Sequence, residues 1–226
     1  MTLANTEPSP FSTELRRLGR KLPHALAHAK RPGTIERIVS AAEGFFAEKG
    51  LEGARTGAIA RAARVNKALL YYYFRSKQDL HRFTLEMLFS QLRDQVGGKL
   101  EEPGPPRQRL LNYVNGYFDF VIAHPNYPRL VQRQVMSRGP GLGGLVDEFY
   151  RPLHERLGKT LRDGIARGEF REVDPPQTVL TLVAITVFYF AAAPVVSQLW
   201  RCDPLTSARV AARRAGDHGR RYHSGR

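Results

Sequence analysis

Residues 55–74, RTGAIARAARVNKALLYYYF, constrain the fold of this chain more than any other stretch. Apolar residues in the first half have the spacing of a short helix that packs inward. They are Ile59, Ala60, Ala63 and Val65. Asn66 follows as the predicted N-cap of a second helix, because its side-chain oxygen can accept a hydrogen bond from the first free N–H groups. Leu70 and Phe74 lie at i, i+4 spacing and are expected to be buried, so the stretch predicts two short helices joined by a tight turn.

The second helix also has a face that folding alone does not explain. That face carries Lys67, Leu69, Tyr71, Tyr72 and Tyr73. Exposing so many phenols beside a cation does not help a small domain to fold, whereas a surface that contacts phosphates and base edges uses such groups. We expect at least one of the three tyrosines to pack inside and the others to donate hydroxyls to phosphates.

The flanking residues complete a longer pattern. It consists of Phe45-Phe46-Ala47-Glu48-Lys49-Gly50, Thr56, Ile59-Ala60, Val65-Asn66-Lys67, Leu70-Tyr71-Tyr72-Tyr73-Phe74 and Ser76-Lys77-Gln78-Asp79-Leu80. With this pattern, residues 34–85 resemble the DNA-binding domain of the TetR (tetracycline-repressor-like) family of bacterial transcription regulators. Arg64 stands where a Gly commonly makes the turn, so we expect it to adopt a left-handed or distorted conformation. Ala68 and Leu69 replace a common Gly and Thr or Ser, so base reading is expected to differ from the family average.

The resemblance implies an all-α protein with two domains. Residues 32–92 are expected to form an N-terminal three-helix helix-turn-helix DNA-binding domain, with its motif at 55–74. Residues 93–201 are expected to form a C-terminal helical domain for ligand binding and dimerisation. Residues 1–31 read as a basic flexible arm, and residues 202–226 as a basic tail with a short helix followed by disorder.

The same resemblance implies a sequence-specific DNA-binding transcriptional regulator, a repressor that acts as a homodimer. A small-molecule effector, which the sequence does not identify, would release it from double-stranded operator DNA. The residues expected to contact DNA are Thr56, Asn66, Lys67, Ala68, Leu69, Tyr71, Tyr72, Tyr73 and Lys77. Among them, Thr56 would serve both as a helix cap and as a phosphate contact.

The distribution of charge agrees with a polyanionic partner. The chain has a net charge of +14 and a pI near 10.4. Residues 1–82 carry 15 basic and 7 acidic groups, residues 83–200 carry 13 and 12, and residues 201–226 carry 7 and 2. Excess positive charge therefore lies on the predicted DNA-binding domain and on the tail, which favours nucleic acid over a chain that is merely basic throughout.

The sequence carries no pattern typical of an enzyme. A single cysteine, Cys202, excludes an intramolecular disulfide and a cysteine metal site, and it fits a reducing cytoplasm. The glycine-rich run at 139–144 has no preceding strand and no Lys-Ser/Thr, the seven histidines are scattered, and no paired carboxylates stand out. We expect no catalytic residue, no metal site and no cofactor, and the N-terminus lacks the apolar run of a signal peptide.

Beyond residue 100 the sequence predicts helices at about 106–123, 127–137, 142–168 with a break near Pro152, and 175–200. Residues 179–196, VLTLVAITVFYFAAAPVV, form an uncharged run of 18 residues. We interpret this helix as a subunit interface, and a membrane-anchored regulator with residues 179–200 as the span is the alternative. The residues expected at a four-helix dimer interface are Leu157, Leu161, Leu182, Val183, Val187 and Phe190.

A regulator of this type needs a cavity for its effector. Aromatic and methionine side chains with a few polar groups typically line such cavities. The candidates are Tyr113, Tyr117, Phe120, His124, Gln132, Arg133, Met136, Phe149 and Tyr189. The alternative is that the aromatic residues at this spacing simply form a core.

Overall fold

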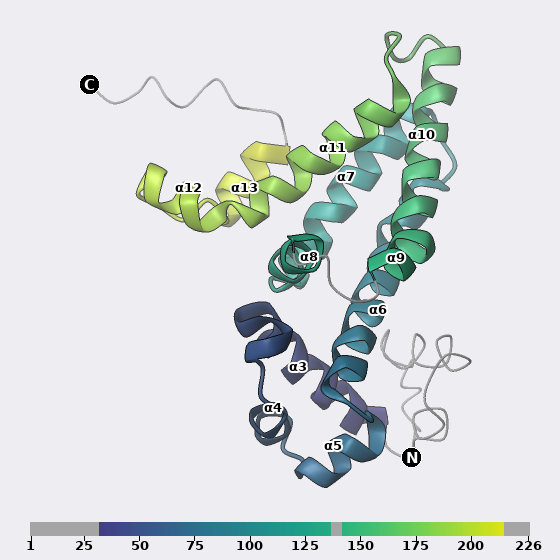
Figure 1. Ribbon diagram of the computed structural model, residues 1–226. Helices are drawn as coiled ribbons and strands as arrows, with labels where there is room; N and C mark the ends of the chain where they lie inside the picture. The colour runs from purple at the N-terminus through teal and green to yellow at the C-terminus, as the bar shows by residue number, and fades with distance from the viewer. Residues whose placement is uncertain (1–31, 137–141, 215–226) are drawn as a thin grey trace, which may run out of the picture.

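The computed structural model describes residues 32–136 and 142–214, and it contains helices and no strand in these ranges (Figure 1). The predicted arm at 1–31 and the predicted disordered end of the tail at 215–226 lie outside the described residues. One lobe contains α3 (Pro32–Gly53), α4 (Thr56–Ala62) and α5 (Lys67–Tyr73). The helix α6 (Lys77–Gln95) runs from this lobe into a second one (Figure 1). The second lobe contains η1 (Gly97–Leu100), α7 (Pro106–Ala123), α8 (Tyr127–Met136), α9 (Leu142–Leu145), η2 (Val146–Tyr150), α10 (Arg151–Ala166), α11 (Pro175–Ala191), α12 (Ala193–Trp200) and α13 (Ser207–Arg214).

The first lobe forms around the apolar stripe of α3. Ile35, Ile38, Ala42 and Phe46 are all fully buried, as their helical spacing predicts. Gly50 has φ 68° and ψ 179° and interrupts the regular helix. Only glycine adopts this backbone conformation without strain, so the chain can turn there towards α4.

The turn between α4 and α5 has an unusual residue. Arg64 adopts a left-handed conformation with φ 56°, which confirms the expectation from its place in the turn. The N–H of Val65 donates to the Ala60 carbonyl at 3.0 Å, and Arg37 Nε donates to the Ala63 carbonyl at 3.2 Å. The last carbonyls of α4 are thus satisfied from both the turn and α3, and these bonds offset the strain at Arg64.

Two proline positions shape the second lobe. The π-helical turn η2 ends two residues before Pro152, which lacks an N–H for a helical hydrogen bond. Leu145, Tyr150 and Arg151 keep helical backbone angles, so the helix is locally widened near the predicted position and not broken. The predicted single helix over 175–200 is instead two helices, α11 and α12, bent by 64°. Pro194 is the second residue of α12 and lies in its first turn, where its missing N–H costs no helical hydrogen bond; it could not continue α11, because it cannot donate to a carbonyl of the preceding turn.

We expect Arg64→Gly to raise the free energy of unfolding by about 0.5–1 kcal/mol, since glycine adopts the left-handed conformation without a Cβ clash. The measurement is urea unfolding of the free protein. Arg61→Gly, three residues earlier and within α4, removes the same charge in a right-handed helix and should lower the stability by about 1 kcal/mol. A loss of stability in Arg64→Gly would contradict the strain at this turn.

Candidate nucleic-acid interface and ligand cavity

The position of α5 is fixed by a cap at one end and two anchors along its inner face. Asn66 Oδ1 accepts a hydrogen bond from the Leu69 N–H at 2.7 Å, as predicted. Leu70 and Phe74 are both fully buried, which stabilises the lobe by about 1.5–3 kcal/mol each. With the inner face held in this way, the rotation of α5 about its axis is set.

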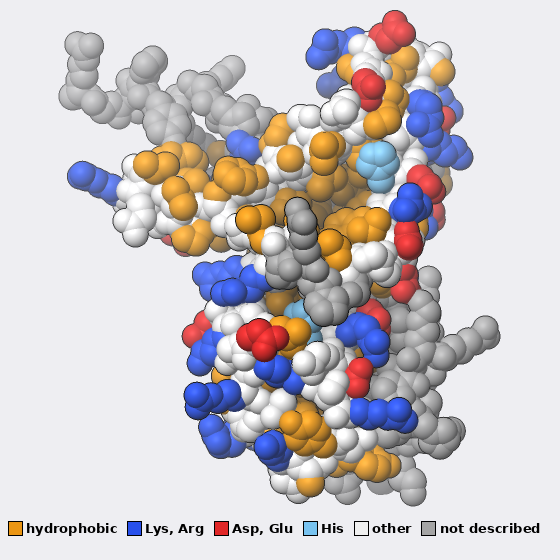
Figure 2. Space-filling view, in the orientation of Figure 1, with side chains coloured by type: hydrophobic (Ala, Val, Ile, Leu, Met, Phe, Trp, Pro, Cys, Tyr) orange, Lys and Arg blue, Asp and Glu red, His pale blue; other side chains and the backbone are white. Residues whose placement is uncertain are grey.

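The outer face of α5 carries both cationic and phenolic groups. Lys67 and Ala68 are exposed, Leu69 is half-buried, and Tyr71 and Tyr72 are 40% and 64% exposed. Lys67 Nζ lies 5.7 Å from the centre of the Tyr71 ring, within the range of a cation–π contact. Figure 2 shows further Lys and Arg side chains over this lobe.

Tyr73 does not belong to this exposed face. It is only 6% exposed, and its ring packs edge-to-face against Tyr72 with centroids 5.2 Å apart. The prediction that at least one of the three tyrosines packs inside is therefore confirmed. The helical period explains the outcome, since Tyr73 follows the buried Leu70 by three residues and shares its side of the helix.

Thr56 and Lys77 have structural partners that the sequence did not reveal. The N-cap of α4 is Arg55, with no side-chain hydrogen bond, so the expectation that Thr56 caps this helix is wrong. Instead, the Thr56 and Tyr71 hydroxyls share a hydrogen bond of 3.2 Å that links α4 to α5. Lys77 Nζ donates to the Glu52 carbonyl at 3.1 Å, which leaves its remaining donors for another acceptor.

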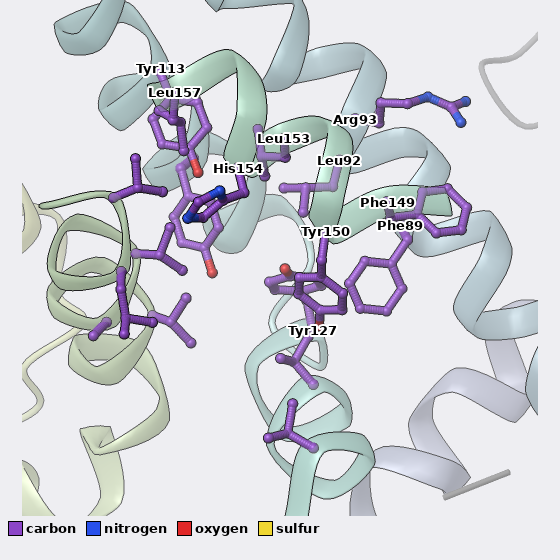
Figure 3. A pocket seen from close by; sticks show the side chains of 18 residues that line it. Phe89, Leu92, Arg93, Tyr113, Tyr127, Phe149, Tyr150, Leu153, His154 and Leu157 are labelled. Carbon is purple, nitrogen blue, oxygen red and sulfur yellow. The ribbon is translucent and has the colours of Figure 1, made fainter. Parts of the chain in front are cut away.

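A cavity of about 350 Å³ lies in the second lobe, bounded by α6, α7, α8, α10, α11 and η2 (Figure 3). Apolar and aromatic side chains form most of its wall, with a few phenols, one imidazole and one guanidinium. Its lining residues are Phe89, Leu92, Arg93, Tyr113, Tyr117, Tyr127, Val131, Val135, Phe149, Tyr150, Leu153, His154, Leu157, Val179, Leu180, Val183, Ala184 and Val187. A wall of this composition and size is typical of a small-molecule site.

Three of the predicted pocket residues, Tyr113, Tyr117 and Phe149, line this cavity. The other six do not. Phe120 is buried against the His124 and Tyr127 rings, and His124 borders a separate hollow of about 470 Å³ with Glu43 and Asn126.

The remaining misplaced residues lie on other helix faces. Gln132, Arg133 and Met136 line a hollow of about 280 Å³, because the opposite face of α8 points to the cavity. The Tyr189 hydroxyl donates to the Pro204 carbonyl, which ties α11 to the segment before α13.

Several lining residues were missed by the sequence analysis. Tyr150 and His154 lie at i, i+4 spacing, a signal that could have placed them on one helix face. Phe89 comes from α6, which begins in the DNA-binding lobe. Nothing in the sequence pattern indicates that α6 would reach this far into the second lobe.

The phenols of the cavity are protonated at neutral pH. Burial raises the pKa of Tyr113, Tyr117, Tyr127 and Tyr150 above the ordinary value, because the phenolate is poorly solvated there. The buried hydroxyls of Tyr117 and Tyr150 have no hydrogen-bond partner of good geometry among the described residues. The Tyr127 phenol nevertheless approaches the Tyr117 oxygen as a hydrogen-bond donor, which offsets part of the rise in the pKa of Tyr117 and leaves the Tyr117 proton without an acceptor in the described part of the chain.

The residues expected at the dimer interface face inward. Leu157, Leu161 and Phe190 are buried and Leu182 is half-buried. Leu157, Val183 and Val187 line the cavity. The structure thus gives these side chains a place inside the chain, because α11 packs against α7, α8 and α10 on that side.

The other side of α11 continues along α12 as an exposed apolar face. It consists of Leu180, Ile185 and Phe188 on α11 and of Val195 and Leu199 on α12, with exposed fractions of 63%, 54%, 70%, 62% and 74%. Figure 2 shows apolar side chains along these two helices. So contiguous an apolar surface is typical of a contact site.

No single helix in the described ranges is long and apolar enough to cross a membrane, and only the bent pair of α11 and α12 meets that test by length and composition. Within the same ranges, no group of three or more His, Cys, Asp or Glu side chains could hold a metal ion.

The fold and the exposed face of α5 define a helix-turn-helix DNA-binding regulator, and comparison with known proteins agrees. A profile described as "Bacterial regulatory proteins, tetR family" matches residues 38–82, and one described as "Tetracyclin repressor-like, C-terminal domain" matches residues 106–216. The HTH-type transcriptional repressor SCO4008 of Streptomyces coelicolor is 30% identical over 167 residues, which cover 74% of this chain and 82% of that protein. The chain belongs to the TetR family of transcriptional regulators.

Other relatives extend this assignment. The HTH-type transcriptional repressor NicS of Pseudomonas putida is 28% identical and covers 75% of this chain and 82% of its own. Among solved structures, transcriptional regulator SCO4942 from Streptomyces coelicolor has a TM-score of 0.64 at 26% identity and covers 81% of this chain and 95% of its own. Ketosteroid transcriptional regulator KstR2 of Mycobacterium tuberculosis has a TM-score of 0.65 at 20% identity, with coverage of 81% and 90%, and shows the shared fold alone.

We expect Lys67→Ala to weaken binding to operator DNA and to flatten the slope of log K against log salt by about 0.9 for each bound subunit, since each subunit loses one phosphate contact. The measurement is a fluorescence-anisotropy titration at several salt concentrations. Lys159→Ala removes the same charge from an exposed position on α10 and should leave the slope unchanged. An unaltered affinity in Lys67→Ala would remove this residue from the interface.

Proposed function

We propose that this protein is a homodimeric repressor that a small molecule binding in the cavity releases from its operator, acting in the cytoplasm. The observation that carries the proposal is the presence in one chain of an exposed cationic and phenolic helix face and a separate apolar cavity. The first is suited to DNA and the second to an effector. Thr56, Asn66, Lys67, Ala68, Leu69, Tyr71, Tyr72 and Lys77 are the proposed DNA-contacting residues, and no catalytic reaction is assigned to the chain.

The exposed apolar face of α11 and α12 supports a dimer. In a two-fold symmetric dimer, the apolar face of α11 and α12 of one copy could pack against the same face of the other, so that both faces are buried. Such a pair would hold two α5 helices for successive major grooves, about 34–36 Å apart. The proposed interface therefore moves from the predicted inward-facing residues to Leu180, Ile185, Phe188, Val195 and Leu199.

A contact between the two lobes suggests how occupancy of the cavity could reach DNA. Arg133 on α8 donates from Nε to the Ala47 carbonyl at 3.0 Å and from Nη2 to the Glu48 carbonyl at 2.8 Å. On the opposite side of α8, Val131 and Val135 line the cavity. A ligand that shifts α8 would pull on the end of α3, and with it on the DNA-binding lobe, so that the conformer that binds DNA becomes less populated.

The test of the proposed function is binding of the purified protein to the DNA directly upstream of its own gene. We expect retardation of that DNA, with affinity that falls steeply as salt rises, and weaker binding to a scrambled sequence of the same composition. Equal affinity for both sequences, or no salt-dependent binding, would contradict the proposal. Footprinting of the protected sequence would then give the half-site spacing.

We expect Phe188→Asp to break the dimer, because a carboxylate would replace a ring that is 70% exposed on the proposed interface. Sedimentation velocity should show a monomer. Ile122→Asp places the same charge on an exposed apolar position of α7 and should leave the dimer intact. A dimer that persists in Phe188→Asp would refute this placement of the interface.

We expect Arg133→Met to lower the free energy of unfolding by about 1–2 kcal/mol, since two carbonyls at the end of α3 lose their charged donor. Hydrogen exchange at the amides near Gly50 should become faster. Arg129→Met changes an exposed arginine one turn earlier on α8 and should have little effect on either measurement. Unchanged exchange in Arg133→Met would argue against coupling between the lobes through this side chain.

A further inference from the structure

The cavity contains two buried hydroxyl groups whose protons have no acceptor of good geometry among the described residues, although the Tyr127 phenol approaches the Tyr117 oxygen as a donor. Tyr117 is only 3% exposed, and neither its hydroxyl nor that of Tyr150 has a hydrogen-bond partner of good geometry among these residues. Both residues line the cavity, and Figure 3 shows Tyr150 near Tyr127 and Phe89. A buried hydroxyl without a partner is unfavourable, so a ligand that supplies one gains free energy on binding.

The chemistry of these hydroxyls defines what such a ligand must offer. Burial raises the pKa of both groups, so they carry their protons at neutral pH and can donate. The matching groups on a ligand are oxygen acceptors, of which a carbonyl is the simplest.

The charges around the cavity argue for an uncharged ligand. No Asp or Glu is among its lining residues, so a buried cation would find no counter-charge. Its one guanidinium, Arg93, already donates to Asp94 at 3.0 Å and to Ser90 at 2.6 Å, and it lies 5.5 Å from the centre of the Phe149 ring. An anion would have to compete with Asp94 for this charge.

The volume of the cavity limits the size of the ligand. A space of about 350 Å³ is near the lower end of the range for small-molecule sites, about 300–1,000 Å³. A compact organic molecule of about 12–20 non-hydrogen atoms therefore fits.

We propose that the cavity binds an uncharged, mainly apolar molecule of this size that presents a carbonyl-type oxygen to the hydroxyls of Tyr117 and Tyr150. This inference rests on the proposed function, because it assigns a ligand class to the proposed effector site. The surrounding aromatic rings and the valines of α8 and α11 take up the apolar body. The two phenols select the oxygen.

Three probes of nearly equal shape test the ligand class on the full-length protein. Benzophenone offers a carbonyl acceptor, diphenylmethane lacks it, and protonated benzhydrylamine replaces it with a cation. Dissociation constants are measured by isothermal titration calorimetry, with thermal shift as a second readout. We expect benzophenone to bind about fivefold to tenfold more tightly than diphenylmethane, and benzhydrylamine to bind more weakly than either.

Matched variants assign the preference to the two hydroxyls. Tyr117→Phe and Tyr150→Phe each remove one buried hydroxyl without changing the ring, so folding should be retained. In the double variant the ratio of the benzophenone and diphenylmethane affinities should fall to about one. Tyr73→Phe, a buried phenol of the first lobe that does not line the cavity, should leave the ratio at its original value.

Each result decides the proposal. Equal binding of benzophenone and diphenylmethane, tighter binding of benzhydrylamine, binding of none of the probes, or a ratio that survives the double variant would overturn it. Operator binding is measured separately, with and without benzophenone. If the protein failed to bind its upstream DNA, the proposed function would be overturned. The probe affinities would still test the ligand class independently.

Discussion

The packing of α6 against α3 and against Phe74, the residue directly after α5, is the interaction on which the rest of the structure depends. Phe83 of α6 meets the ring of Phe74 at 5.4 Å, and Leu80 is fully buried in the same core. Further along the same helix, Phe89 and Leu92 line the cavity. One continuous helix contributes side chains to both cores. A change in the orientation of the DNA-binding lobe therefore also moves α6 within the second lobe.

The helix α8 provides a second contact between the DNA-binding lobe and the lobe that contains the cavity. Val131 and Val135 face the cavity, while Arg133 donates to the Ala47 and Glu48 carbonyls, just before the kink of α3 at Gly50. An arginine is well suited to this position, since its planar, charged guanidinium group can donate hydrogen bonds to two carbonyls at once. The proposed response to a ligand thus needs only a small shift of one amphipathic helix, with no unfolding of either core.

The two sides of α11 lie in different environments, one at the cavity and one at the surface. Val183 and Val187 line the cavity, and Phe188 on the other side is exposed. Leu180 belongs to both, since it lines the cavity and is 63% exposed. A partner seated on the exposed face would therefore border the cavity, which connects the proposed dimer contact with the proposed effector site.

The sequence by itself determined the helical fold, the DNA-binding lobe and the cap of α5, though not the cap of α4, because these features depend on contacts between residues close in the chain. The cap at Asn66, the buried Leu70 and the left-handed Arg64 follow from local spacing and backbone sterics. Only the tertiary structure decided which side of each later helix faces the cavity. The uniformly apolar α11 has no polar face that would indicate its orientation, so the sequence allows Val187 to lie at an interface or in a cavity. In the structure α11 packs against α7, α8 and α10, and Val187 lines the cavity.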